Sequence, residues 1–178
     1  MRLNSYHFLR GIKVMKIGML TAQQVLRECE LFSKLSDAEL EKIASSVQEK
    51  QYEAGATIFQ EGDSAEELLI LQEGKVAVQM TLPKAQIQMS RRITVDIINR
   101  NEVVGWSAIV EPYVYTLTAV CLQKVRALSL SGTKIRWLLR DNPKIGYEVL
   151  KGLIKVVASR LDDTRQLLVS ERQLTGLK

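Results

Sequence analysis

Hydrophobic and polar positions follow three successive patterns along the chain. Over residues 22–48 apolar side chains such as Val25 and Cys29 recur at helical spacing, which predicts helices. A second helix is expected to begin after Ser36, because serine followed three residues later by Glu39 is typical of a capping box. We therefore expect helices at the start of the folded domain.

Between residues 51 and 130 the pattern changes to short strands. Apolar residues alternate with small or polar ones in two stretches, at Val76, Val78 and Met80 and at Ile93, Val95 and Ile97. Alternation of this kind is typical of strands with one buried face. Leu82-Pro83-Lys84-Ala85 separates the two stretches and predicts a hairpin turn. Strands recurring at this spacing indicate a sandwich or barrel.

Helical spacing returns over residues 133–175. A short helix is expected first, and Asn142-Pro143 then begins a long one, because asparagine caps helices well and proline is tolerated in the first turn. One edge of the long helix forms a heptad seam of Leu150, Ile154, Val157, Leu161, Thr164 and Leu168. A second edge contains Leu153 and Val156. Two apolar edges favour packing on the barrel with one and on a partner with the other.

Glycines punctuate the most informative stretch of the chain. It reads G-A-T-I-F-Q-E-G-D from Gly55 to Asp63, then an apolar run from Leu68 to Leu71, then Gly74-Lys75-Val76. Glycine at the ends of strands allows tight corners, because it adopts positive φ without a Cβ clash. This pattern resembles the cyclic nucleotide-binding domain family, as in bacterial catabolite regulators and cyclic-nucleotide-dependent kinases. The resemblance covers the chain from about Leu31 to Leu168.

The resemblance implies a mainly β fold with flanking helices. The expected core is an antiparallel double-stranded β-helix, or jelly-roll barrel, with N-terminal helices before it and a long C-terminal helix after it. We expect a basic extension over residues 1–20 and the domain over 21–178. In the family the long helix pairs two subunits, so the resemblance also implies a homodimer.

The family's phosphate-binding cassette has a counterpart between Gly105 and Ala119. In the family this segment carries a glutamate that accepts from the ribose and, about ten positions later, an arginine that binds the phosphate. The residues that match the scaffold are Gly105, Ser107, Ala108 and Thr116. Trp106 stands where the glutamate belongs and Tyr115 about where the arginine belongs. Both charged anchors are replaced.

These replacements change the expected ligand. A hydrogen bond to a charged group contributes roughly 1.5–3 kcal/mol, so losing two removes several powers of ten in affinity. We therefore expect that cAMP and cGMP do not bind in the family's usual way, unless Arg91, Arg92 or an arginine of a partner chain supplies the contact. One alternative is an aromatic effector pocket for a planar or less polar ligand, with tyrosine hydroxyls as polar groups. The other is a pocket filled by Trp106. The expected pocket residues are Gly105, Trp106, Ser107, Ala108, Tyr113, Tyr115 and Thr116.

The composition bears on where the protein acts and on whether it could be an enzyme. The 178 residues carry a net charge of +5, and the basic Met1–Lys16 stretch lacks the apolar run of a secretory signal, which favours a cytoplasmic protein without a membrane segment. Cys29 and Cys121 stand alone, as expected of buried thiols. A cupin-type enzyme would need several histidine ligands, and His7 is the single histidine. We expect neither a metal site nor catalysis.

Three interpretations of the function remain. The first is a stand-alone sensor domain with an unknown protein partner and a small-molecule effector. The second is a relative of Crp/Fnr-type transcription regulators acting through a partner, because a helix-turn-helix would need about 60–80 residues beyond the long helix and the sequence ends at Lys178. The third is a ligand-free dimerisation or interaction domain. Met15 is an alternative start to Met1.

Overall fold

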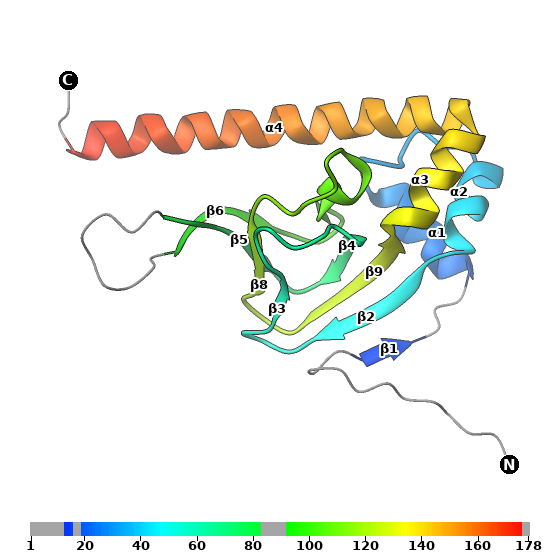
Figure 1. Ribbon diagram of the computed structural model, residues 1–178, viewed down its shortest axis with the longest axis horizontal. Coiled ribbons are helices and arrows are strands. Elements are labelled where there is room, and N and C mark those ends of the chain that lie inside the picture. The colour runs from blue at the N-terminus through cyan, green and yellow to red at the C-terminus, as the bar shows by residue number, and fades with distance from the viewer. Residues whose placement is uncertain (1–12, 16–18, 83–91, 176–178) are drawn as a thin grey trace, which may run out of the picture.

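Helices flank a run of short strands, in the order that the sequence pattern predicts (Figure 1). The computed structural model describes residues 13–15, 19–82 and 92–175. The helices are α1 Met19–Glu28, α2 Asp37–Ala44, the 3-10 turn η1 Trp106–Ile109, α3 Gly132–Asp141 and α4 Pro143–Thr175. The strands are β1 Lys13–Met15, β2 Gln48–Tyr52, β3 Thr57–Phe59, β4 Glu67–Glu73, β5 Val76–Thr81, β6 Arg92–Ile98, β7 Val103–Val104, β8 Thr118–Cys121 and β9 Val125–Ser131.

The strands form two antiparallel sheets that face each other as a jelly-roll barrel. One sheet has the order β1-β2-β9-β4-β7 and the other has the order β3-β8-β5-β6. The expected barrel covers residues 51–130, and the strands β2 to β9 run from Gln48 to Ser131. β5 and β6 pair antiparallel as a hairpin requires, while the predicted turn from Pro83 onward lies outside the described residues.

The fold begins earlier than the predicted boundary at residue 21. β1 pairs antiparallel with β2, with Lys13 opposite Gln51 and Met15 opposite Glu49. Such an edge strand is held by backbone hydrogen bonds and is too short to show a hydrophobic alternation. Part of the expected basic extension is therefore the edge strand of the larger sheet.

β4 is buried on both faces and separates two hydrophobic cores. Leu68 and Ile70 join the core that packs under the helices, whereas Leu69 and Leu71 join the core inside the barrel. A strand covered on both sides needs apolar residues at every position rather than at alternate ones. This explains the continuous apolar run from Leu68 to Leu71 in the sequence.

The capped start predicted for α2 is confirmed. Glu39 accepts hydrogen bonds from the backbone N–H of Ser36, at 2.9 Å, and from its hydroxyl, at 2.8 Å. These hydrogen bonds, first of all the one from the Ser36 backbone, lower the pKa of the Glu39 carboxyl. The carboxylate therefore satisfies a backbone donor that would otherwise lack an intrahelical partner.

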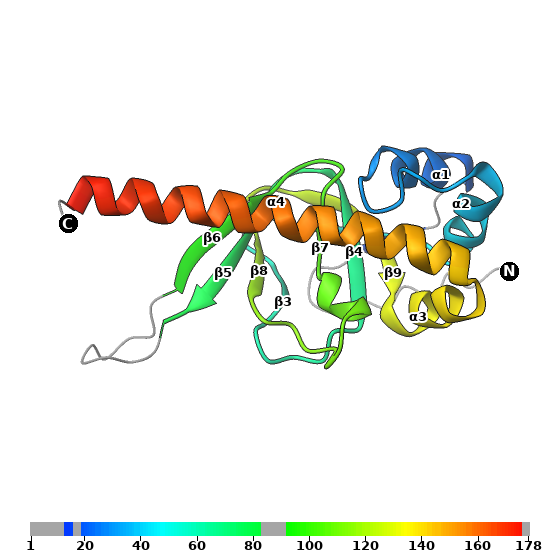
Figure 2. The ribbon, with the colours of Figure 1, turned by 90° about the horizontal axis from the view of Figure 1, so that it is seen from above.

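α4 is a 33-residue helix that lies across the barrel and continues past it (Figures 1 and 2). Its buried edge contains Ile145, Val149 and Leu153, with Val156 packed beside them, so the edge predicted to face the domain is confirmed. α4 packs tightly at Gly152, where an added Cβ would lie 2.6 Å from the carbonyl oxygen of Leu31. Among the described residues, no helix is long and apolar enough to cross a membrane.

The two cysteines are free thiols buried in separate cores, as predicted. Burial raises the pKa of Cys29 to about 12 and that of Cys121 to about 11. Both side chains are therefore protonated at neutral pH and act as small apolar groups rather than as nucleophiles.

Candidate functional site

The segment that corresponds to the cassette begins with a sharp turn at Gly105. This residue has φ +81°, and a Cβ there would lie 2.8 Å from the carbonyl oxygen of Glu67 and 3.2 Å from the rings of Phe59 and Tyr115. Only glycine combines that dihedral with so close an approach. Gly105 thus links β7 to η1 at a point close to the rings of Phe59 and Tyr115.

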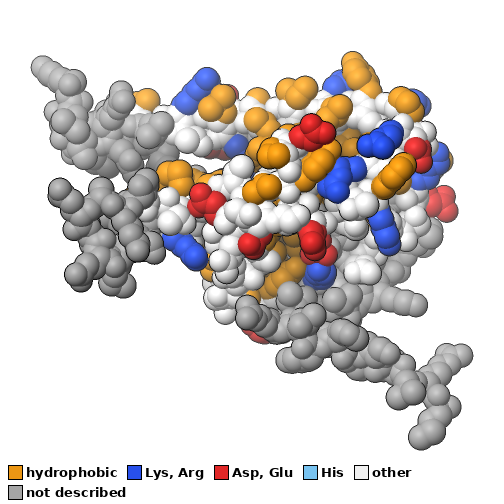
Figure 3. Space-filling model, viewed as in Figure 1, with side chains coloured by type: hydrophobic (Ala, Val, Ile, Leu, Met, Phe, Trp, Pro, Cys, Tyr) orange, Lys and Arg blue, Asp and Glu red, His pale blue; other side chains and the backbone are white. Residues whose placement is uncertain are grey.

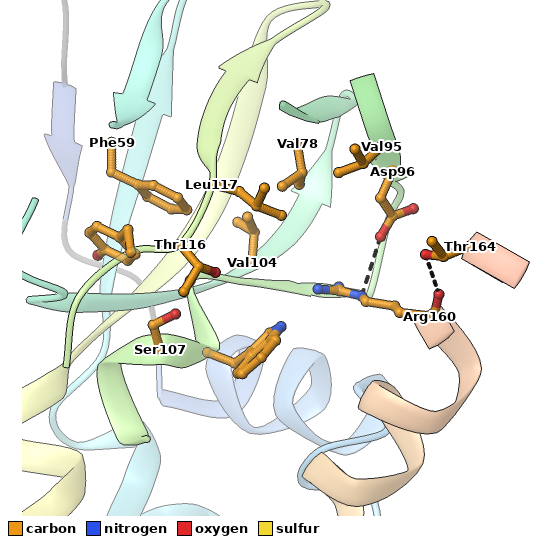
Figure 4. Close-up of a pocket in the computed structure, with 13 residues that line it drawn as sticks. Phe59, Val78, Val95, Asp96, Val104, Ser107, Thr116, Leu117, Arg160 and Thr164 are labelled. Carbon is orange, nitrogen blue, oxygen red and sulfur yellow. Dashed lines mark hydrogen bonds and ion pairs between the residues drawn. The ribbon is translucent and has the colours of Figure 1, made fainter. Parts of the chain in front are cut away.

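A pocket of about 160 Å³ opens beside this turn (Figure 4). It is lined by Phe59, Val78, Val95, Asp96, Val104, Gly105, Trp106, Ser107, Tyr115, Thr116, Leu117, Arg160 and Thr164. Its walls are mainly aliphatic and aromatic, with a few polar groups, as in most small-molecule sites. Of the seven expected residues, Gly105, Trp106, Ser107, Tyr115 and Thr116 are brought together here. Trp106 is one of the lining residues, and the pocket beside it is not completely filled by its side chain.

Tyr115 is held in place by both its ring and its hydroxyl. The ring stacks on Phe59 with centroids 3.7 Å apart and planes within 8°. The hydroxyl donates to the carbonyl of Glu67 at 2.8 Å and accepts from the Glu67 backbone N–H at 3.1 Å. Burial raises the pKa of this phenol to about 12, so it stays neutral. Tyr115 therefore offers the pocket an aromatic surface, while its hydroxyl fixes β4 rather than serving as the polar group that the sequence suggested.

Tyr113 and Ala108 do not line this pocket. Tyr113 has φ +58°, and its ring lies 4.2 Å from the guanidinium of Arg136, beside a different surface hollow. Ala108 is fully buried in the helix-side core, and its carbonyl accepts from Nη1 of Arg136 at 2.6 Å. Arg136 of α3 thus holds the cassette segment at both Ala108 and Tyr113. These two cassette residues contact Arg136 and do not line the pocket.

An arginine does reach the pocket, from α4. Nε of Arg160 lies 3.4 Å from Oδ2 of Asp96, and Nη2 donates to the carbonyl of Val103. Burial lowers the pKa of the guanidinium, and the neighbouring carboxylates, first Asp96, oppose that shift. Of the arginines considered in advance, Arg92 is exposed and does not line the pocket, and Arg91 lies outside the described residues. Arg160 was missed because basic residues on a surface helix usually face solvent.

A β-bulge in β6 brings Asp96 to face Arg160. The pairing of β5 with β6 shifts register between Val78, opposite Asp96, and Gln79, opposite Thr94, which leaves Val95 as the extra residue. Bulges re-aim side chains in this way. Val95 and Asp96 consequently both line the pocket. The predicted alternation fails beyond this point, since Ile97 is 45% exposed.

Figure 4 shows the resulting arrangement. Phe59 and Arg160 lie on opposite sides of the pocket, with Thr116, Leu117 and Val104 between them. Arg160 extends from α4 toward the cavity, and Thr164, one turn further on, donates its hydroxyl to the Arg160 carbonyl at 2.8 Å. The pocket thus has an apolar aromatic end and a charged end built by the barrel and the long helix.

The fold and pocket define a small jelly-roll barrel with a site that is lined by the barrel, the cassette segment and the C-terminal helix. The family model described as "Cyclic nucleotide-binding domain" matches residues 49–142, and the chain belongs to that family. A CRP-like cAMP-activated global transcriptional regulator of Mycobacterium tuberculosis is 25% identical over 145 residues, covering 82% of this chain. The chain spans 61% of that regulator's length.

Solved structures agree with this assignment. A cyclic nucleotide-binding domain from Methylobacillus flagellatus has a TM-score of 0.72 at 19% identity, over 86% of this chain and 83% of that one. The N-terminal domain of a transcriptional regulator from Streptomyces coelicolor has a TM-score of 0.62 at 26% identity, over 78% of this chain and 92% of that one. The family model thus shows the family, and the solved structures show the same fold.

Proposed function

We propose that this chain is a non-enzymatic regulatory module of the cytoplasm that senses a small-molecule effector and signals through α4. The observation that carries the proposal is that one pocket is lined both by the cassette segment, at Gly105–Ser107, and by α4, at Arg160 and Thr164. A ligand there would contact the sensing segment and the output helix together. Its binding energy would then differ between alternative positions of α4, which is the requirement for a switch.

The proposed sensor has an atypical effector site. By the family resemblance, Trp106 stands where the ribose-binding glutamate belongs and Tyr115 about where the phosphate-binding arginine belongs. The charged groups lining the pocket are Asp96 and Arg160, which face each other. The Mycobacterium tuberculosis relative is activated by cAMP by its name; for this chain we propose that neither cAMP nor cGMP binds in the family's way.

The proposed output is a homodimer formed through α4. Its heptad edge is exposed in the single chain: Leu150 is 50%, Ile154 67%, Val157 38% and Leu161 48% accessible. Figure 3 shows hydrophobic side chains along the edge of the molecule that α4 forms. A 3.5-residue repeat of apolar side chains is typical of helices that pair with a second helix. A second copy of α4 would cover this edge.

Thermal denaturation with and without ligand tests the proposal. Wild-type protein is scanned with cAMP, with cGMP and with a library of small metabolites, and each stabilising compound is followed by hydrogen exchange. We expect no response to the cyclic nucleotides, and slower exchange in α4 around Arg160 with the true effector. A rise of roughly 5–11 °C with millimolar cAMP or cGMP would contradict the atypical site. Protection of the pocket with unchanged α4 would contradict the sensor.

A further inference from the structure

The charged end of the pocket is electrically balanced. Asp96 and Arg160 are the acidic and basic side chains that line the pocket, and they lie within ion-pair distance of each other, Nε to Oδ2 at 3.4 Å. Their side chains are only 30% and 23% exposed, so solvent screens the pair incompletely. The guanidinium is therefore already compensated, and an anionic ligand entering the pocket would meet the Asp96 carboxylate at close range.

The same pair offers a ligand both a donor group and an acceptor group. On Arg160, Nε faces Asp96 and Nη2 donates to Val103, while Nη1 makes no hydrogen bond or ion pair with another described residue. On Asp96, Oδ1 accepts from the backbone N–H of Ile97 at 2.7 Å, and each carboxylate oxygen has a further lone pair. A group with a carbonyl beside an N–H, such as a carboxamide, satisfies both. A carboxylate or phosphate satisfies only the arginine.

The rest of the pocket limits the size, shape and polarity of the ligand's main part. Phe59, Leu117 and Val104 line the apolar part of the pocket. The ring of Tyr115, which stacks on Phe59, lines it as well. The pocket's volume of about 160 Å³ is close to that of an engineered apolar cavity, about 150 Å³, that binds benzene. A single flat ring fits this space, and no second cation is available among the pocket's described lining residues to hold a sugar phosphate.

We propose that the effector is a small uncharged molecule with a flat apolar body and an amide-like edge, bound with its body against Phe59 and Tyr115 and its edge against Asp96 and Arg160. The inference rests on the proposed function, and it names the chemical class of the effector at that site. Because the polar end carries no net charge, binding is expected to discriminate against anions of the same shape.

Benzamide and benzoate are matched probes for this proposal, since they share a ring and differ by one charge. The reporter is Trp106, made the single tryptophan by Trp137→Phe, because Trp137 is exposed and does not line the pocket. Dissociation constants are measured by fluorescence and by calorimetry. We expect benzamide to bind the wild-type pocket about tenfold or more tightly than benzoate, the size of one hydrogen bond to a charged group.

Asp96→Asn reverses the expected preference, because it removes the negative charge among the described residues that line the pocket and leaves Arg160 as the charged lining residue. The carboxylates of Glu102 and Asp163 also act on Arg160, but neither residue lines the pocket. Benzoate should then bind at least as tightly as benzamide. Asp162→Asn is the matched control. It removes a carboxylate that pairs with Arg165 on the exposed face of α4, the helix that carries Arg160. This variant should therefore keep the wild-type preference for benzamide over benzoate. If Asp96→Asn fails to fold, the comparison of benzamide with benzoate on the wild-type protein still tests the proposal.

Two results would overturn the inference. If benzoate binds wild-type protein as tightly as benzamide, the effector class is wrong while the pocket remains a binding site and the proposed function stands. If neither probe binds the wild type, the inference also fails. The proposed function is then decided by the metabolite screen, which does not depend on these probes.

Discussion

The guanidinium of Arg160 lies against the carboxylate of Asp96, and this contact joins the middle of α4 to the barrel wall. Asp96 stands on β6, which follows the undescribed segment 83–91, while Arg160 belongs to the helix that we propose as the output. Both residues line the candidate effector pocket. A ligand that changes this contact would change how α4 rests on the barrel.

Arg160→Gln is expected to lower the free energy of unfolding by about 1–3 kcal/mol, because it removes the partner of Asp96 and a donor to the Val103 carbonyl. Urea denaturation measures the change, and a double-mutant cycle with Asp96→Asn measures the coupling. Arg165→Gln is the control, since its pair with Asp162 is exposed on the same helix and should be worth less than about 1 kcal/mol. Equal losses for both arginine variants would contradict a structural role for Arg160.

Gly105→Ala and Gly55→Ala together separate steric crowding from backbone strain. The two glycines have φ +81° and +80°, but an added Cβ meets the Glu67 carbonyl at 2.8 Å in one case and nothing within 4 Å in the other. Gly55→Ala is expected to cost about 1–2 kcal/mol from the left-handed conformation alone. Gly105→Ala should cost clearly more and should also change the fluorescence of Trp106. Similar Tm values for the two variants would show that the turn at Gly105 can open.

Most of the architecture follows from the spacing of apolar residues. The alternation around Val76 and Val78 and the run from Leu68 to Leu71 predict buried strands, and the long amphipathic stretch after Pro143 predicts α4. Such patterns are visible because each strand or helix must bury one face against the rest of the molecule. β1 could not be predicted from such a pattern, because it is held by backbone hydrogen bonds and is only three residues long.

The polar end of the site could not be predicted by the same means. Asp96 faces the pocket because of a bulge at Val95, and no glycine or proline at that position announces the change of register. Arg160 reaches the cavity because α4 crosses the barrel, a contact between residues far apart in sequence. One signal was present: Val149, Val156 and Arg160 lie at spacings of seven and four residues, so the arginine continues the helix's buried edge.

Tyr115→Phe tests whether the phenol serves the fold or the ligand. The hydroxyl makes two hydrogen bonds to the backbone of Glu67, so its removal should cost about 1–3 kcal/mol of stability by leaving buried groups unpaired. The stacked ring remains, and affinity for an uncharged ring compound such as benzamide should change little. A large loss of ligand affinity at unchanged stability would instead place the hydroxyl in contact with the ligand.

Alkaline pH is expected to weaken the fold through Cys29. Its pKa rises from 9.0 to about 12 on folding because burial disfavours the thiolate. The folded state therefore holds its proton more tightly, so this stabilisation is complete below pH 9 and is lost as pH rises toward 12. Urea denaturation between pH 8 and about 11 should show wild type losing more stability than Cys29→Ala, which has no thiol to ionise. Parallel curves would contradict the burial effect.

Charges placed on the heptad edge of α4 test the proposed dimer. Leu150→Lys and Ile154→Lys fall on residues that are 50% and 67% exposed in the single chain. If a second copy covers this edge, the double variant should sediment as a monomer while its circular dichroism and its monomer stability stay close to those of the wild type, because neither side chain is buried within one chain. Leu153→Ala is the contrasting variant. That side chain is only 6% exposed, in the helix-side core, so its truncation should lower the free energy of unfolding by about 2–4 kcal/mol. A lysine variant that remains dimeric would move the interface to another surface.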